Sequence, residues 1–328
     1  MKRETKLSSF AKYAWFVLAY NVVVILWGVF LRASKSGDGC GASYPLCNGM
    51  IIPHAAEIKT IVEFSHRVTS ALDGIFLIAL VVWAFLIWRF NKSKNGHLFK
   101  AAIGSLVFVI IEGLIGAGLV LTGNTAETLT ASRPFWMAGH LINTLILLTF
   151  LTLTAWFASG GKSFNFKAPP KVLLFLGIAV LGIFFVGMSG SVAALSSMLF
   201  PSETLTEGMA KDFSSTSNIL LRLRISHPIL SIMVAVFLVF LAGWFKSKTP
   251  GNFRVNRWAN VLTVLIVVQI AFGALTLLTL APIVMQIGHL FLADAVWIVF
   301  VLLSASFLAE QNELPEALKT TASQQPMP

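Results

Sequence analysis

The sequence predicts an all-α integral membrane protein with eight transmembrane helices. Of the 328 residues, 56% are hydrophobic and only 12% are charged, whereas about a quarter of the residues in a typical soluble domain are charged. Eight apolar stretches are long enough to form helices that cross a hydrocarbon core of about 30 Å. They cover residues 13–32, 62–90, 101–121, 135–158, 172–199, 218–245, 257–281 and 283–309.

The distribution of positive charge predicts the orientation of these spans. The first stretch has basic flanks, but it is longer than the apolar part of a signal peptide and lacks a small-residue cleavage site, so we expect it to remain as a span. Most of the 24 Lys and Arg residues lie on the side of the N-terminus. Because such residues accumulate on the cytoplasmic side, both termini are expected in the cytoplasm. No basic patch with interleaved aromatic residues indicates a nucleic-acid partner.

An internal repeat divides the chain into two halves. The third stretch contains Glu-x-x-x-Gly-Ala from Glu112, and the seventh contains Gln-x-x-x-Gly-Ala from Gln269. Because each half has four spans, an even number, both halves enter the membrane from the same side. This is the arrangement of parallel repeats related by an axis along the membrane normal. We therefore expect two pseudo-twofold-related four-helix bundles, residues 1–160 and 161–328, each with a site between facing helices.

Four histidines fall inside the predicted spans: His66, His140, His227 and His289. The first and third follow Ser, while the second and fourth lie between Gly and Leu. All four are near the outer ends of even-numbered spans, roughly 5–14 Å below the outer boundary. An imidazole in hydrocarbon is costly without a partner, so these residues indicate function. Two imidazole pairs could provide the axial ligands of two haems. The other histidines are expected in loops: His54 and His97.

The two cysteines of the chain, Cys40 and Cys47, both lie in the first outer loop. On the outer side of a membrane a disulfide can persist. Three interpretations stay open: a disulfide that staples the loop, a reversible thiol pair beside the site, and metal binding. No further Cys or His residue lies at the spacing of a zinc site.

An acidic residue distinguishes the first histidine pair from the second. Glu63 and His66 are three residues apart and share one helix face. The carboxylate could orient the imidazole or act as a base near a porphyrin edge. Alternatively, it complements the dipole at the helix N-terminus. The second half has Arg224 at the corresponding position, so the two halves are expected to differ in function.

Other charged residues near the predicted sites include three arginines that could bind haem propionates: Arg67, Arg222 and Arg224. The last two could instead extend to the outer membrane interface. Glu112 is interpreted as a hydrogen-bonded packing residue rather than a proton relay. Two further acidic residues inside spans have no assigned role: Asp73 and Asp294.

Separate motifs along the chain occur together in one known family. Residues 63–67 read Glu-Phe-Ser-His-Arg, residues 36–49 contain Ser-Gly-x-Gly-Cys and Pro-Leu-Cys-Asn-Gly, and residues 221–228 read Leu-Arg-Leu-Arg-Ile-Ser-His-Pro. In these motifs, over about residues 15–305, the sequence resembles the heme A synthase family. Tyr44 stands where many members carry Trp before Pro, which keeps an aromatic residue.

The resemblance implies an oxidoreductase that converts a porphyrin ring methyl of haem O to a formyl group by successive hydroxylations, giving haem A for aa3-type cytochrome oxidase. It implies haem O as substrate between His66 and His140, with Glu63 catalytic. Haem b would be the cofactor between His227 and His289. Both sites would lie toward the extracytoplasmic face.

The resemblance also suggests protein partners. These are a haem O synthase, subunit I of cytochrome oxidase or its assembly factors, an electron acceptor such as a quinone, and a second copy of the chain in a homo-oligomer. Two other functions fit the histidines. One is a di-haem b-type membrane electron-transfer protein that modifies neither haem. The other is a haem carrier or assembly factor without catalysis.

Overall fold

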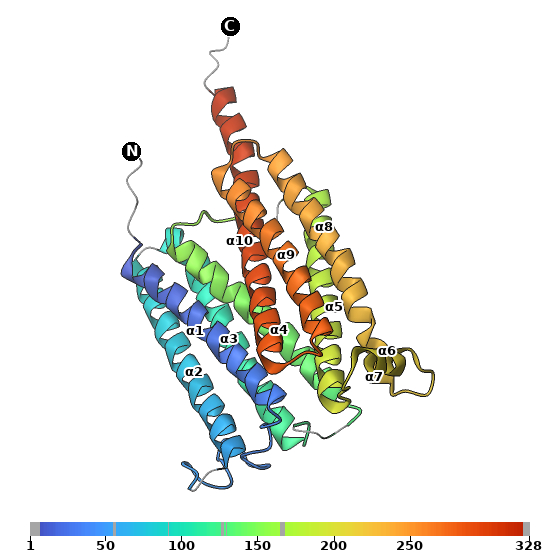
Figure 1. Cartoon of the computed structure of the whole chain (residues 1–328). Coiled ribbons are helices and arrows are strands. Elements are labelled where there is room, and N and C mark those ends of the chain that lie inside the picture. Colours follow the sequence, from blue (N-terminus) through green and yellow to red (C-terminus); the bar gives the residue numbers. More distant parts are fainter. Residues whose placement is uncertain are drawn as a thin grey trace.

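The structure, a computed structural model, describes residues 7–54, 57–90, 92–125, 128, 130–164 and 168–323. In these residues it contains helices and no strand (Figure 1). The helices are α1 Ser9–Ala33, α2 Ile58–Phe90, α3 Lys92–Leu121, α4 Arg133–Ala158, α5 Pro170–Leu199, α6 Leu205–Phe213, α7 Ile219–Arg224, α8 Ser226–Lys248, α9 Phe253–Leu278 and α10 Ile283–Ser323. Eight helical stretches are long and apolar enough to cross a membrane. The predicted class and number of spans are therefore confirmed.

The sixth span, expected as one helix over 218–245, is interrupted at Ile225 between α7 and α8. Pro228 is the third residue of α8. Proline is tolerated in the first turn of a helix, where its missing N–H has no helical partner, but it disrupts a helix interior. A new helix that begins at Ser226 therefore accommodates Pro228 and places His227 in its first turn.

The short helix α6 was not expected, because residues 205–213 were assigned to an outer loop. Thr204 caps it by accepting a hydrogen bond from the backbone N–H of Glu207 at 3.2 Å. The carboxylate of Glu207 accepts in turn from the backbone N–H of Glu203 at 2.8 Å. The spacing is that of a Thr-x-x-Glu capping box, with the Glu carboxylate bonded to the N–H one residue before the cap. The signal was therefore present in the sequence.

Two spans extend farther than their apolar stretches. α3 begins at Lys92 rather than near residue 101, so His97 lies in a helix and not in a loop. Its ring contacts that of Phe157, with centroids 5.9 Å apart. α10 continues to Ser323, beyond the predicted end near residue 309. Polar helical turns beyond the hydrocarbon region are not marked by hydropathy, which explains both differences.

Neighbouring helices pack in chain order within each half: α1 on α2, α2 on α3 and α3 on α4, then α5 on α8, α8 on α9 and α9 on α10. The halves meet where α4 packs on α5 and α10, and where α1 packs on α10. α1 begins and α10 ends at the same end of the molecule (Figure 1). The description as two pseudo-twofold bundles stays a prediction.

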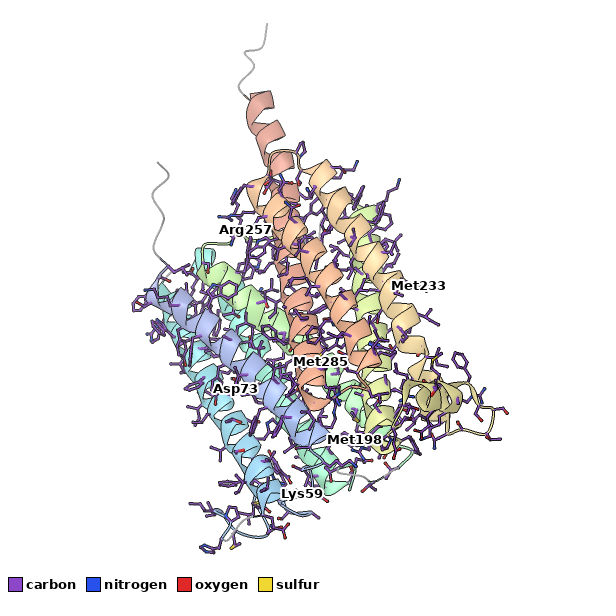
Figure 2. All side chains as sticks on the ribbon, in the orientation of Figure 1. Lys59, Asp73, Met198, Met233, Arg257 and Met285 are labelled. Carbon is purple, nitrogen blue, oxygen red and sulfur yellow. A yellow bond between two sulfur atoms is a disulfide. The ribbon has the colours of Figure 1, made fainter. Side chains whose placement is uncertain are left out.

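Buried contacts join these helices, while many apolar side chains point outward from the bundle (Figure 2). The indole N–H of Trp297 in α10 donates to the carbonyl of Leu145 in α4 at 2.6 Å. Phe245 of α8 and Phe307 of α10 are fully buried and stack with centroids 3.9 Å apart. In contrast, Phe240 of α8 is 55% exposed. Outward apolar side chains of this kind suit contact with lipid tails.

Replacing Phe307 with Ala should destabilise the protein by roughly 3–5 kcal/mol, because the loss of a buried aromatic ring leaves a cavity. The matched change Phe240→Ala removes an outward ring and should have a much smaller effect. Thermal unfolding of both variants in the same detergent checks the difference. Equal losses of stability in the two variants would contradict the packing described here.

Candidate functional site

The four intramembrane histidines come together at one end of the molecule. His66 lies in α2, His140 in α4, His227 in α8 and His289 in α10, each within the first nine residues of its helix. These four helices begin at the same end of the bundle, where the loop with the two cysteines connects α1 to α2 (Figure 1). The membrane side on which this end lies stays a prediction.

The second-half pair consists of two imidazoles that lie close together in an edge arrangement. The ring centroids of His227 and His289 are 6.2 Å apart and the ring planes are perpendicular. An iron bound between two imidazoles, with bonds of about 2 Å to nitrogen, places the ring centroids about 6 Å apart. His227 Nδ1 lies 3.1 Å from the hydroxyl of Ser189. Such a partner on the second ring nitrogen is typical of a metal-bound histidine. The residues present therefore fit a bis-histidine haem.

Glycines on neighbouring helices create the space for three of these rings. A Cβ atom at Gly190 or Gly273 would lie 2.9 Å from Cε1 of His227 or His289, respectively. A Cβ at Gly28 would lie 3.2 Å from Cε1 of His66. Each of these imidazoles thus packs directly on the backbone of an adjacent helix. Larger residues at these positions would displace the rings.

Three imidazoles also have a buried Nδ1 atom with no hydrogen-bond partner in the described part of the chain: His66, His140 and His289. Buried polar atoms are nearly always hydrogen-bonded. Leaving them unpaired inside a membrane protein is costly. These three nitrogens therefore suit a partner from outside the described residues.

The first-half pair has a carboxylate against one of its rings. His66 and His140 are close enough to interact electrostatically. Nε2 of His140 lies 3.4 Å from Oε1 of Glu112 in α3. The same carboxylate accepts hydrogen bonds from the side chains of Asn143 and Thr144. Glu112 is thus bonded within the helix packing, as the sequence suggested, and it also contacts a candidate ligand.

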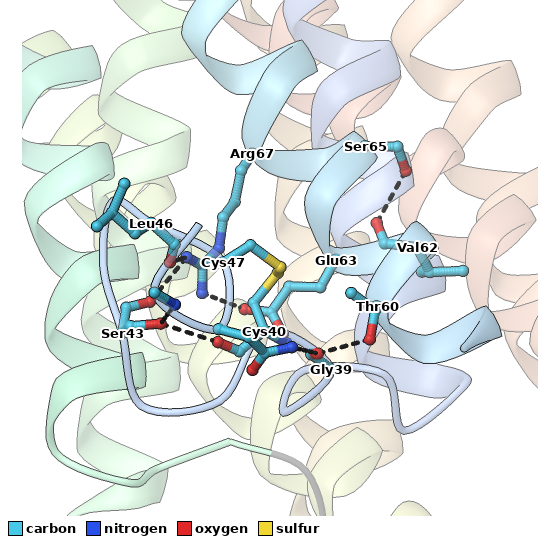
Figure 3. Close-up of a disulfide and its surroundings, with 12 residues drawn as sticks. Gly39, Cys40, Ser43, Leu46, Cys47, Thr60, Val62, Glu63, Ser65 and Arg67 are labelled. Atoms are coloured by element: carbon cyan, nitrogen blue, oxygen red, sulfur yellow. Dashed lines mark hydrogen bonds and ion pairs between the residues drawn. A yellow bond between two sulfur atoms is a disulfide. The ribbon is translucent and has the colours of Figure 1, made fainter. Parts of the chain in front are cut away.

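Glu63 lies at the centre of a network that holds the first outer loop (Figure 3). It is 3% exposed. One carboxylate oxygen accepts the backbone N–H of Cys40 at 2.8 Å, and the other accepts from Arg67 at 2.5 Å. Arg67 also donates to the carbonyls of Ser43 at 2.8 Å and Leu46 at 2.7 Å. The acid and the arginine of α2 therefore fix the loop beside His66.

The two cysteines of this loop form a disulfide with an S–S distance of 2.03 Å. Both Cys40 and Cys47 are buried. The hydroxyl of Thr60 in α2 donates to the carbonyl of Gly39 at 2.7 Å and fixes the start of the loop. The observed bond leaves two of the three interpretations open, a permanent staple and a reversible thiol pair.

The remaining candidate residues have different surroundings. Arg224 pairs with Asp212 of α6, with Nε 3.0 Å from Oδ1, while Arg222 is exposed. Asp73 accepts from Asn21 of α1 at 2.7 Å. Asp294 is buried, and one of its oxygens has no hydrogen-bond partner among the described residues. The propionate roles predicted for the three arginines stay predictions.

Sequence reasoning missed two glycines that shape the site, Gly28 and Gly190. The separation of Gly28 from Gly190 in the sequence is one residue longer than the separation of His66 from His227, so the two glycines hold nearly equivalent positions in the repeat. The internal repeat could therefore have identified them. The repeat gives no such indication for the partner of Arg224, which is Asp212 in the unexpected helix α6.

Most of the chain is similar to known proteins. The model of the family described as cytochrome oxidase assembly protein, COX15-CtaA, matches residues 11–301. A protein of Thermus thermophilus named protoheme IX farnesyltransferase is 40% identical over 313 residues, which are 94% of this chain and 50% of that protein. The chain thus spans about half the length of this relative.

Several bacterial relatives carry the name heme A synthase. One from Alkalihalophilus pseudofirmus is 27% identical over 255 residues, which are 75% of this chain and 80% of that protein. One from Halalkalibacterium halodurans is 38% identical over 133 residues, 40% of this chain and 42% of that protein. The family match covers most of the chain, from near the start of the first span into the last. The chain therefore belongs to the COX15-CtaA family of cytochrome oxidase assembly proteins.

Proposed function

We propose that this chain is a heme A synthase, a membrane oxidoreductase that converts a ring methyl of haem O to the formyl group of haem A. One observation carries the proposal. Two imidazole pairs lie at the same end of the bundle, and in the described part of the chain it is the first pair that has a disulfide loop beside it, held by the buried Glu63. The names of several relatives support the same activity.

The two sites are proposed to have different tasks. His227 and His289 would hold haem b, which supplies electron transfer when bound. Their ring centroids are 6.2 Å apart, and Ser189 contacts the Nδ1 atom of His227. His66 and His140 would hold the haem O substrate. The contact of His140 with Glu112 suits a ligand that must release its porphyrin after each reaction.

Glu63 is the proposed catalytic residue. A methyl C–H bond is too weakly acidic for a carboxylate to break without oxidation, so a redox cofactor must act first. With water as the source of the oxygen atom, converting methyl to formyl releases four electrons and four protons in two oxidations. A two-electron acceptor such as a quinone must therefore be reduced twice. Cys40 and Arg67 hold the Glu63 carboxylate in place. It can accept a proton released at the porphyrin edge or stabilise positive charge there.

The proposed partners follow from this reaction. A farnesylated haem must come from a haem O synthase, and the Thermus relative carries the name of a protoheme IX farnesyltransferase. The haem A made by this chain would pass to subunit I of cytochrome oxidase or to assembly factors, as the family description suggests. Association with a second copy of the chain is also proposed.

Two other functions compete with this one. A di-haem electron-transfer protein would use both imidazole pairs without changing either haem. The name of the Thermus relative favours farnesyl transfer, although half of that protein lies outside the match. The masses of haems extracted from the purified protein distinguish the proposed enzyme from both alternatives, because only the proposed enzyme contains a formyl-bearing product.

Replacing Glu63 with Gln should lower haem A formation by about 100-fold or more, the usual contribution of a positioned acid or base. Haem content should stay near that of the wild type. Mass-resolved haem extracts from cells that make haem O provide the measurement. Glu203→Gln, which removes an exposed acid just before α6, is the control. Unchanged haem A in the Glu63 variant would exclude the proposed role of this residue.

Replacing Gly273 with Val should weaken haem b binding by roughly 5- to 100-fold, because the added side chain overpacks the site and pushes against the His289 ring. His289→Ala should abolish binding at this site. Absorbance in the Soret region per chain is the measurement. Gly243→Val in α8, where a Cβ would meet nothing within 4 Å, is the control. Equal haem b content in the two glycine variants would argue against this location for the cofactor.

A further inference from the structure

A haem carries two propionate carboxylates, and charged carboxylates near hydrocarbon require partners. Two of the arginines suggested by the sequence already pair with acids of the chain. Arg67 is bound to Glu63, and Arg224 to Asp212. A cation without a carboxylate partner would be a better match for an incoming propionate at the first site.

Arg32 in the last turn of α1 is such a cation. It is half-buried, and its side chain donates a hydrogen bond from Nη2 to the amide oxygen of Gln286 at 3.3 Å. No carboxylate of the described residues lies within ion-pair distance of it. A partly buried charge without a counter-ion is costly. An anion from outside the chain would therefore be stabilised beside Arg32.

The helix geometry places Arg32 above the first histidine pair. Gly28 and Arg32 are four residues apart and share one face of α1. His66 packs against Gly28 on that face. Arg32 lies about 6 Å farther toward the outer end of the helix. Its guanidinium extends toward α10, where Gln286 accepts its hydrogen bond, at the end of the bundle that holds the histidines.

A second arginine approaches from the opposite helix. Arg133 begins α4, two turns before His140 on the same face. Its side chain is 2% exposed, and it donates to the carbonyl of Thr128 at 2.6 Å. Arg32 and Arg133 are close enough for their like charges to repel each other. A carboxylate between them would relieve this repulsion.

We propose that Arg32, together with Arg133, binds the propionates of the haem held by His66 and His140. This inference rests on the proposed function, because it names the partners of the same substrate. The internal repeat places Ala194 at the position of Arg32 and Pro282 at the position of Arg133. The arginine pair is therefore a property of the first site alone.

The test compares haem O with its dimethyl ester, in which both carboxylates are masked. Full-length protein that retains its haem b is reconstituted in lipid nanodiscs and titrated with each form, and binding is followed in the Soret region. The wild type should bind the free acid roughly 10- to 100-fold more tightly than the ester, as expected for a charge-assisted bond. Arg32→Gln should remove most of this preference, and Arg32→Lys should retain part of it.

A matched control is Arg89→Gln, which removes one positive charge from an exposed position at the other end of α2. It should leave the preference for the free acid unchanged. Equal wild-type affinity for acid and ester would overturn the proposal. So would an Arg32→Gln variant that binds both forms more weakly by the same factor, because this indicates a structural role.

These outcomes separate the inference from the function on which it rests. Binding of haem O without preference for the free acid rejects the arginine pair but leaves the enzyme proposal standing. A wild type that binds no haem O overturns both. If Arg32→Gln does not fold, the Arg32→Lys variant decides, since a preference identical to that of the wild type would contradict a planar guanidinium contact.

Discussion

The structure depends on the cost of placing four imidazoles inside a membrane. Each ring needs a partner, and three have a buried nitrogen that no described residue satisfies. Glycines on adjacent helices let three of the rings pack directly on the backbone. The helix starts and the glycine positions at this end of the bundle suit the proposed binding of two haems between paired histidines.

The two halves meet this requirement in different ways. In the second half, the centroids of two perpendicular rings lie 6.2 Å apart and a serine contacts one of them. In the first half, charged side chains surround the pair: Glu63 with Arg67 on the loop side, and Glu112 beside His140. The two halves therefore differ in the groups beside their histidines, and the proposal of a cofactor site and a substrate site uses this difference.

Much of the fold could be predicted from the sequence, because hydropathy marks the hydrocarbon-spanning stretches and the repeat marks the histidines. The break before Ser226 required recognition that Pro228 belongs in a first turn. The site contacts were less predictable. The bonds of Glu63 with Cys40 and Arg67 depend on how a loop packs on α2. The absence of a carboxylate partner for Arg32 among the described residues depends on how distant helices pack together. Local sequence patterns carry no such information.

The most direct test of the account is the ratio of iron porphyrin to chain in purified full-length protein from cells that supply both haem b and haem O. Two bound tetrapyrroles per chain at saturation are expected, with the low-spin ferric signal of two imidazole ligands in electron paramagnetic resonance. Protein without Soret absorbance, even after addition of haem, would contradict the central claim that the four histidines bind two haems.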